Sequence, residues 1–465
     1  MKSNKIIICM LVLILIISAL PAYGRAEYFS SNPNIRIGLI FGSSARTSFE
    51  TSSPNGFIIG EVRPGGTVFY ARRHIANTNI SVTRRNNRLA VVNPSTGAVI
   101  YEYTRDHNLA IIAARSTQFD SRFTELTTRT TGIKTTANNN IYTGAFIYRA
   151  AANGGVEVIN LVSLDDYLKG VVPSEMFPSW ETEALRAFAI VARTFAVRSI
   201  RNNRHDGQAF DICNSTHCQV FTGMSRATDR TNAAVEYTSG LVITHNGNLI
   251  QALYHSSSGG ATESHNDAWG GNLIYSYLTG VQLPMENYNE SGRNNSRWTN
   301  SVSPQELFEY LVNESPRAAL FRGNLNSAIA DIRINSRSSS NRITSLTVTD
   351  NNGNSVTVNN SDAIRHAFSR FARSSNMDIS RERSFSAFAA TAAASSNINI
   401  EPGHTYIISA SGVTTAPSYI AIASASGVST LQPQETSDYF IFDGRGWGHG
   451  VGMSQWAAQD MALLG

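Results

Sequence analysis

The chain has 465 residues, of which 42% are hydrophobic and 15% charged, and its formal net charge is +4. This length leaves room for two or three domains, and the apolar content excludes a chain that is disordered throughout. A weak basic excess, with no basic run interleaved with aromatic residues, argues against nucleic acid as the partner and suits an anionic wall-like or membrane-proximal polymer.

The first 24 residues have the pattern of a targeting segment. Lys2 and Lys5 precede a continuous apolar stretch, residues 6–20, which is short for a membrane span of about 20 residues. Small residues follow at 21–24, where a signal peptidase would cut. We therefore predict a signal peptide over 1–24 and an exported protein of the cell wall or extracellular space, with an uncleaved N-terminal membrane anchor as the alternative.

Residues 25–150 are predicted to form a β-rich region. Ile35, Ile37, Leu39 and Phe41 alternate with other residues, as in a half-buried strand. Further short apolar runs are separated by Asn, Gly, Ser and Thr clusters, and they lie at 90–92, 98–101, 109–113 and 145–148. No chemical motif stands out in this part of the chain.

Glu175 is the candidate catalytic residue. It lies between Pro173 and Pro178, after the apolar pair Val171 and Val172, so we expect a strand followed by a stiff loop. A lone carboxyl beside an apolar core element can have its pKa raised by desolvation, which suits a general acid near neutral pH. The alternative is an ordinary surface glutamate near a helix N-terminus.

A long amphipathic helix is expected after this loop, with Ser179 as its N-cap. The residues that recur at helical spacing and should face the core are Leu185, Phe188, Ala192 and Phe195. Arg186 and Arg193 are seven positions apart and share another face. They are either solvated, or they hold an anionic ligand or orient Glu175.

Cys213 and Cys218 are the two cysteines outside the targeting segment. Outside the cytosol such a pair is expected to form a disulfide. The alternative is a zinc site, because thiolate and imidazole ligands suit zinc. His205 completes a better trio with the cysteines than His217, whose side chain would diverge from that of Cys218 on a strand. The residue chemistry leaves both alternatives open.

Four more elements are expected farther along the chain. A helix should begin at Ser303, followed by Pro304 at the first helical position. Residues 343–358 have the pattern of a hairpin, residues 387–396 that of a loop or weak helix, and residues 404–430 that of a further pair of strands.

Five glycines occupy alternate positions from 444 to 452. On an extended strand this spacing would strip one face of side chains and place Arg445, Trp447 and His449 on the other. Either another backbone or a flat ligand such as a sugar ring would approach the bare face. The spacing does not match a phosphate-binding loop.

Residues 254–271 are rich in hydroxyl groups and small residues. His255 beside Ser256, Ser257 and Ser258 allows a serine nucleophile, but the G-x-S-x-G elbow is absent. We expect these side chains to line a carbohydrate cleft instead.

Four stretches together resemble the SpoIID/LytB family, strongly at these blocks and weakly elsewhere over about residues 30–465. They are LDDYLKGVVPSEMFPSWETEALRAFAIVARTFAV, DICNSTHCQVFTG, YHSSSGGATES and GRGWGHGVGMSQWAA. The resemblance implies a lytic transglycosylase that cleaves peptidoglycan between N-acetylmuramic acid and N-acetylglucosamine. Such an enzyme leaves a 1,6-anhydromuramic end and prefers glycan free of stem peptides.

The resemblance also implies roles for particular residues. Glu175 matches the glutamate of the family's Glu-Met motif, and Cys213 and Cys218 match zinc ligands, with His205 as the third. We expect substrate contacts from Arg193, His255, Ser256, Ser257, Ser258, Arg445, Trp447, His449 and Gln455.

The predicted fold is α+β, with a SpoIID-like catalytic domain over 151–465 that the resemblance suggests is incomplete at its C-terminus. Within it, one glutamate would serve as acid and then as base, whereas ordinary glycosidases need two carboxylates. The predicted partners are peptidoglycan glycan strands, with a cell-wall amidase or another sporulation wall hydrolase beside them. The alternative function is non-enzymatic glycan binding that enhances an amidase.

Overall fold

The structure is a computed structural model that describes residues 25–28, 32–64, 66–104, 108–114, 133–135, 140–271, 275–287, 297–390, 395–400, 406–409, 412–415, 420–424, 427–431 and 434–465. It divides into two compact units, Met1–Leu253 with Met461–Gly465, and Tyr254–Asp460. The domain boundary predicted at 150/151 falls inside the first unit.

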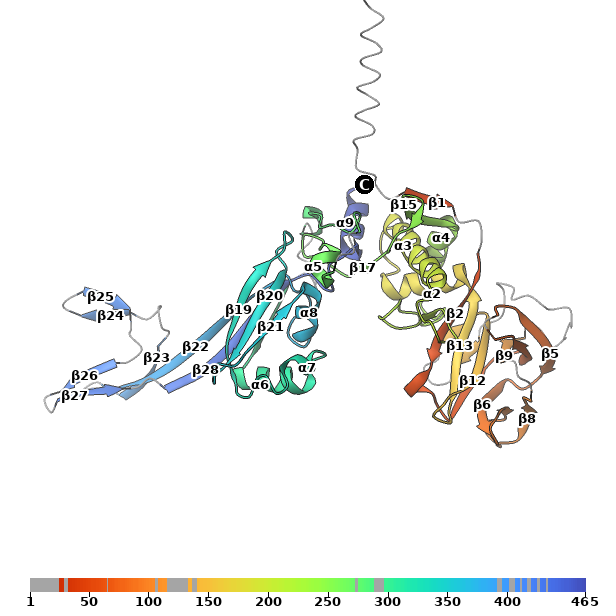
Figure 1. Cartoon of the computed structure of the whole chain (residues 1–465), viewed down its shortest axis with the longest axis horizontal. Helices are drawn as coiled ribbons and strands as arrows, with labels where there is room; N and C mark the ends of the chain where they lie inside the picture. The colour runs from red at the N-terminus through yellow and green to blue at the C-terminus, as the bar shows by residue number, and fades with distance from the viewer. Residues whose placement is uncertain are drawn as a thin grey trace, which may run out of the picture. The chain divides into compact units, whose positions relative to one another are not determined.

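The strands of the first unit form two larger sheets (Figure 1). Their bounds are β2 Asn34–Ile40, β3 Ser48–Ser52, β4 Phe57–Val62, β5 Phe69–Ile75, β6 Asn79–Arg85, β7 Arg88–Val92, β8 Val99–Glu102, β9 Asn108–Ala113, β10 Ile133–Thr135, β11 Ile141–Tyr142, β12 Ala145–Ala150, β13 Val156–Ser163 and β14 Ile212–Cys213. The strand orders are β11-β10-β3-β6-β7-β8 and β14-β2-β13-β12-β9-β4-β5. All these pairs are antiparallel except β14 with β2.

The two sheets pack on each other through aromatic side chains. The ring of Phe49 on β3 meets that of Phe146 on β12 edge-on, with centroids 5.8 Å apart. The apolar runs predicted as strands are confirmed as β7, β8, β9 and β12. Because β13 lies in the same sheet as β12, the β-rich region continues past residue 150.

The alternation predicted for β2 holds only at its start. Ile35 and Ile37 are fully buried, but Ile40 is buried in place of Leu39. The cause is a register shift opposite Val158, which changes the face that the following residues present.

Three helices accompany these sheets, α2 Leu164–Glu175, α3 Thr182–Arg201 and α4 Asp229–Tyr237, with a small sheet of β1 Arg25–Tyr28, β15 Leu241–His245 and β16 Asn248–Leu249. The predicted strand and loop before Glu175 are wrong, because Val171 and Val172 lie within α2. Pro173 lies inside α2, two residues from its C-terminal end, and the helix forms there although proline has no N–H to donate to the carbonyl of Lys169.

The predicted long helix is confirmed as α3, but its N-cap is Glu181 and not Ser179. Ser179 instead belongs to a turn in which the N–H of Trp180 donates to the carbonyl of Phe177. The four residues predicted to face the core are buried, namely Leu185, Phe188, Ala192 and Phe195.

The second unit combines short helices with several sheets. Its elements are β17 Tyr254–His255, α5 His265–Trp269, η2 Pro284–Asn287, β18 Arg297–Val302, α6 Pro304–Glu309, η4 Tyr310–Glu314, α7 Ala318–Phe321, β19 Ile329–Arg337, β20 Ile343–Asp350, β21 Ser355–Asn359, α8 Ser361–Ala367, β22 Met377–Ala390, β23 Ser395–Ile400, β24 Tyr406–Ser409, β25 Gly412–Thr415, β26 Ile420–Ser424, β27 Gly427–Leu431, β28 Gln434–Arg445 and β29 Met453–Ser454. The last helix of the chain is α9 Gln455–Leu464.

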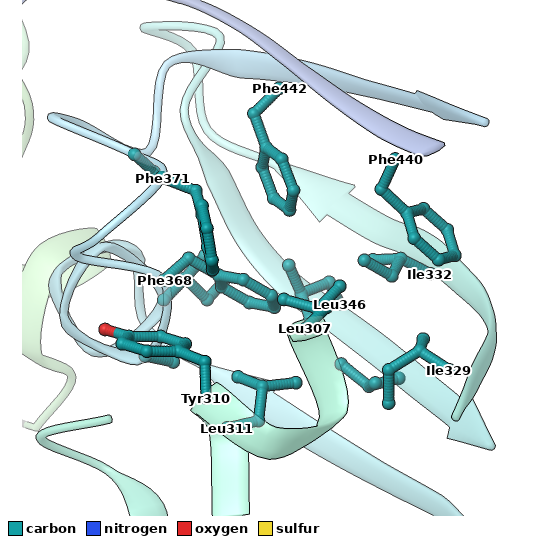
Figure 2. Close-up of a cluster of buried hydrophobic side chains, with 14 of the residues drawn as sticks. Leu307, Tyr310, Leu311, Ile329, Ile332, Leu346, Phe368, Phe371, Phe440 and Phe442 are labelled. Carbon is teal, nitrogen blue, oxygen red and sulfur yellow. The ribbon is translucent and has the colours of Figure 1, made fainter. Parts of the chain in front are cut away.

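Figure 2 shows the core of this unit, where side chains of α6 and η4 meet those of β19, β20, α8 and β28. Leu307, Phe368 and Phe442 are fully buried in it. The predicted helix after Ser303 is confirmed, since the Ser303 hydroxyl accepts a hydrogen bond from the N–H of Glu306 at 3.3 Å.

The predicted hairpin is confirmed as β20 and β21, and the predicted strands at 404–430 appear as two hairpins, β24–β25 and β26–β27. The loop or weak helix expected at 387–396 is wrong, because β22 and β23 occupy most of that stretch. β22 gains ladder hydrogen bonds from both β23 and β28, and this pairing outweighs the weak local preference of alanine and serine.

The described residues contain strands and helices in separate arrangements, which confirms the α+β class. Among these residues, no helix is both long enough and apolar enough to cross a membrane. The predicted targeting segment, residues 1–24, lies outside the part of the chain that the structure describes.

Candidate active site and metal cluster

Glu175 is the last residue of α2, and its carboxylate is anchored. The backbone N–H of Val220 donates to its Oε1 at 2.6 Å, and the side chain is partly buried. A hydrogen bond to a carboxylate from a fixed backbone N–H is strong and orients the acid. Glu175 therefore stands at a helix end with a defined side-chain position, not on a free loop.

The segment that anchors Glu175, residues 219–223, packs along α2. The Tyr167 hydroxyl donates to Gln219 Oε1 at 3.2 Å, and the Tyr167 ring lies 5.0 Å from that of Phe221. A Cβ on Gly170 would lie 2.5 Å from the Phe221 ring, so only glycine allows this approach. Burial holds the pKa of Tyr167 well above its usual value, so the phenol is neutral and remains a donor.

A cluster of two cysteines and two histidines precedes this segment directly. His205, Cys213, His217 and Cys218 each offer one ligand atom, and these atoms all lie within 4.8 Å of one another. Both cysteines are free thiols. The structure thus brings together the predicted trio of His205, Cys213 and Cys218.

The expectation that the side chain of His217 diverges from that of Cys218 is wrong. The Nδ1 of His217 is 3.4 Å from Cys218 Sγ and 3.5 Å from Cys213 Sγ. The reasoning assumed a strand, on which adjacent side chains diverge, but residues 214–218 form a turn after β14. Two Cys and two His donors at this separation fit the tetrahedral set that zinc prefers.

The two thiols interact before any metal is considered. The hydrogen bond between them lowers the pKa of Cys213 to about 3 and raises that of Cys218. Arg204 Nε donates to Cys218 Sγ at 3.4 Å, so a cation lies beside the pair. A cysteine binds metal as the thiolate, and the hydrogen bond between the thiols together with the nearby Arg204 favours at least one thiolate in the pair.

Arg193 was predicted to contact substrate, and the structure places it inside the first unit. Its side chain is 1% exposed. Its guanidinium donates to Asp165 Oδ1 at 3.1 Å, to the carbonyl of Thr238 at 2.7 Å and to that of Val235 at 3.1 Å. Arg193 therefore ties α2, α3 and α4 together. The neighbouring Arg186 pairs with Glu183 at 2.6 Å.

The glycine-rich segment belongs to the second unit and is not an extended strand. β28 ends at Arg445, and the glycines that follow have positive φ, 75° at Gly446, 106° at Gly448, 83° at Gly450 and 77° at Gly452. Only glycine adopts this repeated left-handed backbone without strain. The predicted continuous bare face is therefore wrong.

The space beside these glycines is filled by the protein itself. A Cβ would lie 2.2 Å from the Trp298 ring at Gly444, 2.8 Å from the Ser257 carbonyl at Gly446 and 2.5 Å from the Arg342 guanidinium at Gly450. Of the two alternatives, close approach by other parts of the chain agrees with the structure, and a sugar ring on this face does not.

Gly450→Ala is expected to destabilise the protein by about 3 kcal/mol, because the new methyl group must displace the buried Arg342. Gly353→Ala is the matched control, with φ +85° and nothing within 4 Å of its added Cβ. That control isolates the cost of positive φ, about 1 kcal/mol. Chemical denaturation of both variants measures the difference, and equal losses would show that Arg342 yields freely.

His255, Ser257 and Ser258 are buried in the second unit, and Ser256 is partly buried. Their main partner is Glu286, which was not predicted from the sequence and is 1% exposed. Its Oε1 accepts hydrogen bonds from the Ser257 hydroxyl at 2.6 Å and the Ser258 N–H at 2.7 Å, and its Oε2 accepts from the Ser258 hydroxyl. No motif surrounds Glu286, so the sequence carried no signal for it.

His255 and His449 are neutral near pH 7. Burial lowers the pKa of His255 well below its usual value, and burial lowers that of His449 to about 4. The Nδ1 of His449 accepts from the Val451 N–H at 3.0 Å. The other residues predicted to contact substrate differ in exposure. Trp447 is 42% exposed and has Arg373 over its ring, and Arg445 is exposed. Gln455 is buried at the start of α9.

Comparison with known proteins adds two family matches. Residues 152–245 match a family described as "Stage II sporulation protein". Residues 276–391 match a family described only as a domain of unknown function. The first match contains Glu175 and the whole Cys/His cluster, whereas the second interrupts the span over which the sequence resemblance was drawn.

Several curated proteins are similar to parts of this chain. An uncharacterized protein of Brachyspira hyodysenteriae is 33% identical over 39% of this chain and 47% of its own. The amidase enhancer of Bacillus subtilis is 43% identical over 23% of this chain and 14% of its own. The stage II sporulation protein D of Bacillus subtilis is 31% identical over 35% of this chain and 49% of its own. The chain thus spans about half or less of these relatives.

Proposed function

We propose that this chain is a peptidoglycan lytic transglycosylase, because residues 152–245 match the family described as "Stage II sporulation protein" and part of the chain is similar to the stage II sporulation protein D of Bacillus subtilis. It cleaves the bond between N-acetylmuramic acid and N-acetylglucosamine in glycan strands and leaves 1,6-anhydromuramic ends. The observation that carries the proposal is the carboxylate of Glu175, held at the end of α2 by the N–H of Val220.

The placement of other acids on α2 supports a one-carboxylate mechanism. Asp165 and Asp166 lie in the first turn of the same helix, ten and nine residues from Glu175. A rise of 1.5 Å per residue separates them from it by about 14 Å. Two catalytic carboxyls of ordinary glycosidases lie about 5 to 9.5 Å apart, so neither aspartate can serve as the second. Asp165 is instead bonded to Arg193 and to the Ser239 hydroxyl.

The proposed reaction uses Glu175 twice. Its protonated carboxyl donates to the glycosidic oxygen as the bond to C1 of muramic acid breaks. The resulting carboxylate then takes the proton of the muramic C6 hydroxyl, whose oxygen forms the new bond to C1. Glu175 ends protonated, as it began, and no water is consumed. The fixed hydrogen bond from Val220 keeps one oxygen in place through both steps.

We further propose that His205, Cys213, His217 and Cys218 hold a structural zinc ion. Bound there, the ion cross-links the turn 214–218 to His205. The segment that carries Val220 begins one residue after Cys218, so the same cross-link would steady the anchor of Glu175.

The proposed setting is outside the cytoplasm, at the cell wall. The test is to incubate the purified chain with peptide-free glycan strands and no other protein, and to measure anhydromuramic ends by mass spectrometry. Release of these ends is expected.

The second candidate is a non-enzymatic enhancer of a cell-wall amidase. It is favoured by the 43% identity to the amidase enhancer of Bacillus subtilis. Under this candidate the same incubation releases no anhydro ends. The chain instead increases the release of stem peptides by an added amidase from glycan that still carries its peptides.

A further inference from the structure

Phe177, two residues after Glu175, has an exposed aromatic ring. Its side chain is 57% exposed. The other phenylalanines whose side chains the structure describes are buried or partly buried. Single exposed apolar residues are ordinary, but a phenylalanine ring left in water forgoes one of the largest gains that burial offers. A ligand that covers the ring at this place would recover part of that gain.

A β-turn fixes the backbone that carries this ring. The turn comprises residues 177–180, and the N–H of Trp180 donates to the carbonyl of Phe177 at 3.0 Å. Pro178 occupies the second position of the turn, where its ring fixes φ before any ligand binds. Binding to a surface that is already ordered loses little conformational entropy.

Trp180 supports the ring of Phe177 from the side of the core. Its side chain is only 8% exposed, and its ring centroid lies 5.3 Å from that of Phe177 with the planes inclined at 51°. Aromatic rings at this separation attract each other. The buried tryptophan therefore holds the phenylalanine in place and leaves the outer part of its ring open to a ligand.

The exposed ring and the anchored carboxylate of Glu175 leave the chain close together. Met176, between them, has an extended backbone and is 2% exposed. Two residues of chain span at most about 7 Å, a length comparable to that of one sugar ring. The Val220 N–H fixes the carboxylate, so the acid and the ring have a defined separation. A sugar that covers Phe177 would lie at or next to the glycosidic bond that meets Glu175.

The sugars of a β-1,4-linked glycan have a surface that suits an aromatic ring. N-acetylglucosamine and N-acetylmuramic acid carry their ring substituents equatorially, so each ring face presents C–H groups. Such a face is flat and apolar, and it covers a phenyl ring without leaving a polar group unpaired. The lactyl group of muramic acid leaves from the ring edge and does not obstruct this contact.

We propose that the turn of residues 177–180 is a stacking platform that holds a β-1,4-linked N-acetylhexosamine ring beside Glu175. The choice of ligand rests on the proposed function, which makes glycan the molecule that meets this acid. Because the platform contacts the ring face and not the lactyl group, it also accepts N-acetylglucosamine alone. The chain therefore binds chitin oligomers, which contain no muramic acid.

The test uses the full chain carrying Glu175→Gln, so that no cleavage occurs, and titrates it with N-acetylchitohexaose by isothermal titration calorimetry. Binding is expected, and adding Phe177→Ala should weaken it about tenfold, because the covered ring is lost. Phe177→Tyr keeps the ring and should bind like its parent. Val99→Ala removes exposed apolar surface on β8, is the matched control and should change nothing.

A second readout uses the chain with Glu175 intact. Phe177→Ala should raise KM for peptide-free glycan about tenfold and leave kcat within about twofold, since stacking holds the ground state and the transition state alike. Because the side chain is exposed, the melting temperature should stay unchanged. Phe177→Leu keeps apolar bulk without a flat ring and should also weaken binding, so it replaces Phe177→Ala if alanine unfolds the turn.

No measurable binding of the hexaose by the parent chain, or equal binding by the folded variant that lacks the ring, overturns the proposal. A loss in Phe177→Tyr as large as that in Phe177→Ala also overturns it. The outcome is separable from that of the proposed reaction. A wild-type chain that releases no anhydro ends, but whose hexaose binding depends on Phe177, keeps the platform and loses the transglycosylase. Release of these ends with a KM that Phe177→Ala leaves unchanged keeps the transglycosylase and removes the platform.

Discussion

Replacing Glu175 with glutamine is expected to reduce the release of 1,6-anhydromuramic ends by about 10³-fold, the usual scale for loss of a general acid–base residue. Glutamine has nearly the shape of the acid, and its side-chain oxygen can still accept from the N–H of Val220. What it lacks is the transferable proton. The measurement is the initial rate of anhydro-end release from peptide-free glycan, with the melting temperature recorded for each variant.

Glu183→Gln is the matched control for this substitution. Glu183 lies in the first turn of α3 and its carboxylate pairs only at the surface with Arg186, at 2.6 Å. Exposed pairs of this kind contribute about 1 kcal/mol or less to stability, so the control should retain wild-type activity. Undiminished anhydro-end release by the Glu175→Gln chain would remove Glu175 from the reaction. A loss in both variants would indicate damage to the helix pair instead.

The sequence predicted α3 and several β-strands well because these elements follow local rules. Periodic burial of Leu185 and Phe188 is a property of one helix and one core face. The error at Val171 has a different origin. Pro173 suggested a loop, but it lies inside α2, where Val171, Val172 and Pro173 are all buried and this burial outweighs the local cost of the proline.

The candidate site was only partly visible in the sequence. Glu175 and the two cysteines could be recognised from the residues next to them in the sequence. The hydrogen bond from the Val220 N–H to Glu175 could not, because it depends on how residues 219–223 fold against α2. His217 was misjudged because a strand was assumed where the chain turns. The Cys-x₃-His-Cys spacing of Cys213, His217 and Cys218 was the signal available in the sequence for a shared site.

The glycine-rich segment shows the limit of a pattern without its context. Its alternate spacing suggested a strand that faces a ligand, but Gly444, Gly446, Gly448 and Gly450 each lie against a different neighbour. One of these neighbours, Arg342, is more than a hundred residues away and fully buried. Packing between residues so far apart in the chain gives no periodic pattern in a single sequence. The hydrogen bonds of Glu286 to Ser257 and Ser258 could not be predicted for the same reason.

Removal of metal is expected to lower the melting temperature of the first unit by about 10 °C or more. Structural zinc contributes its binding free energy to folding, and about 1 kcal/mol shifts the midpoint by about 2–4 °C in a unit of this size. A strong chelator should therefore destabilise the wild-type chain, and added zinc should restore it. Element analysis of the untreated protein should find one zinc ion per chain.

A disulfide between Cys213 and Cys218 predicts the opposite response: a reductant would lower the melting temperature and a chelator would not. The free thiols and the Nδ1 of His217 at 3.4 Å from Cys218 Sγ favour the metal.

His217→Gln tests whether the zinc ion has four protein ligands or three. If His217 is a ligand, its loss should weaken zinc binding by about 100-fold, which is at least the effect of losing a residue that only orients a ligand. His74→Gln on β5 is the control, because that histidine lies on a strand and outside the cluster. Unchanged zinc affinity in the His217→Gln chain would return the site to His205, Cys213 and Cys218. A melting temperature that responds to reductant alone would replace the ion with a covalent bond as the element that steadies the anchor of Glu175.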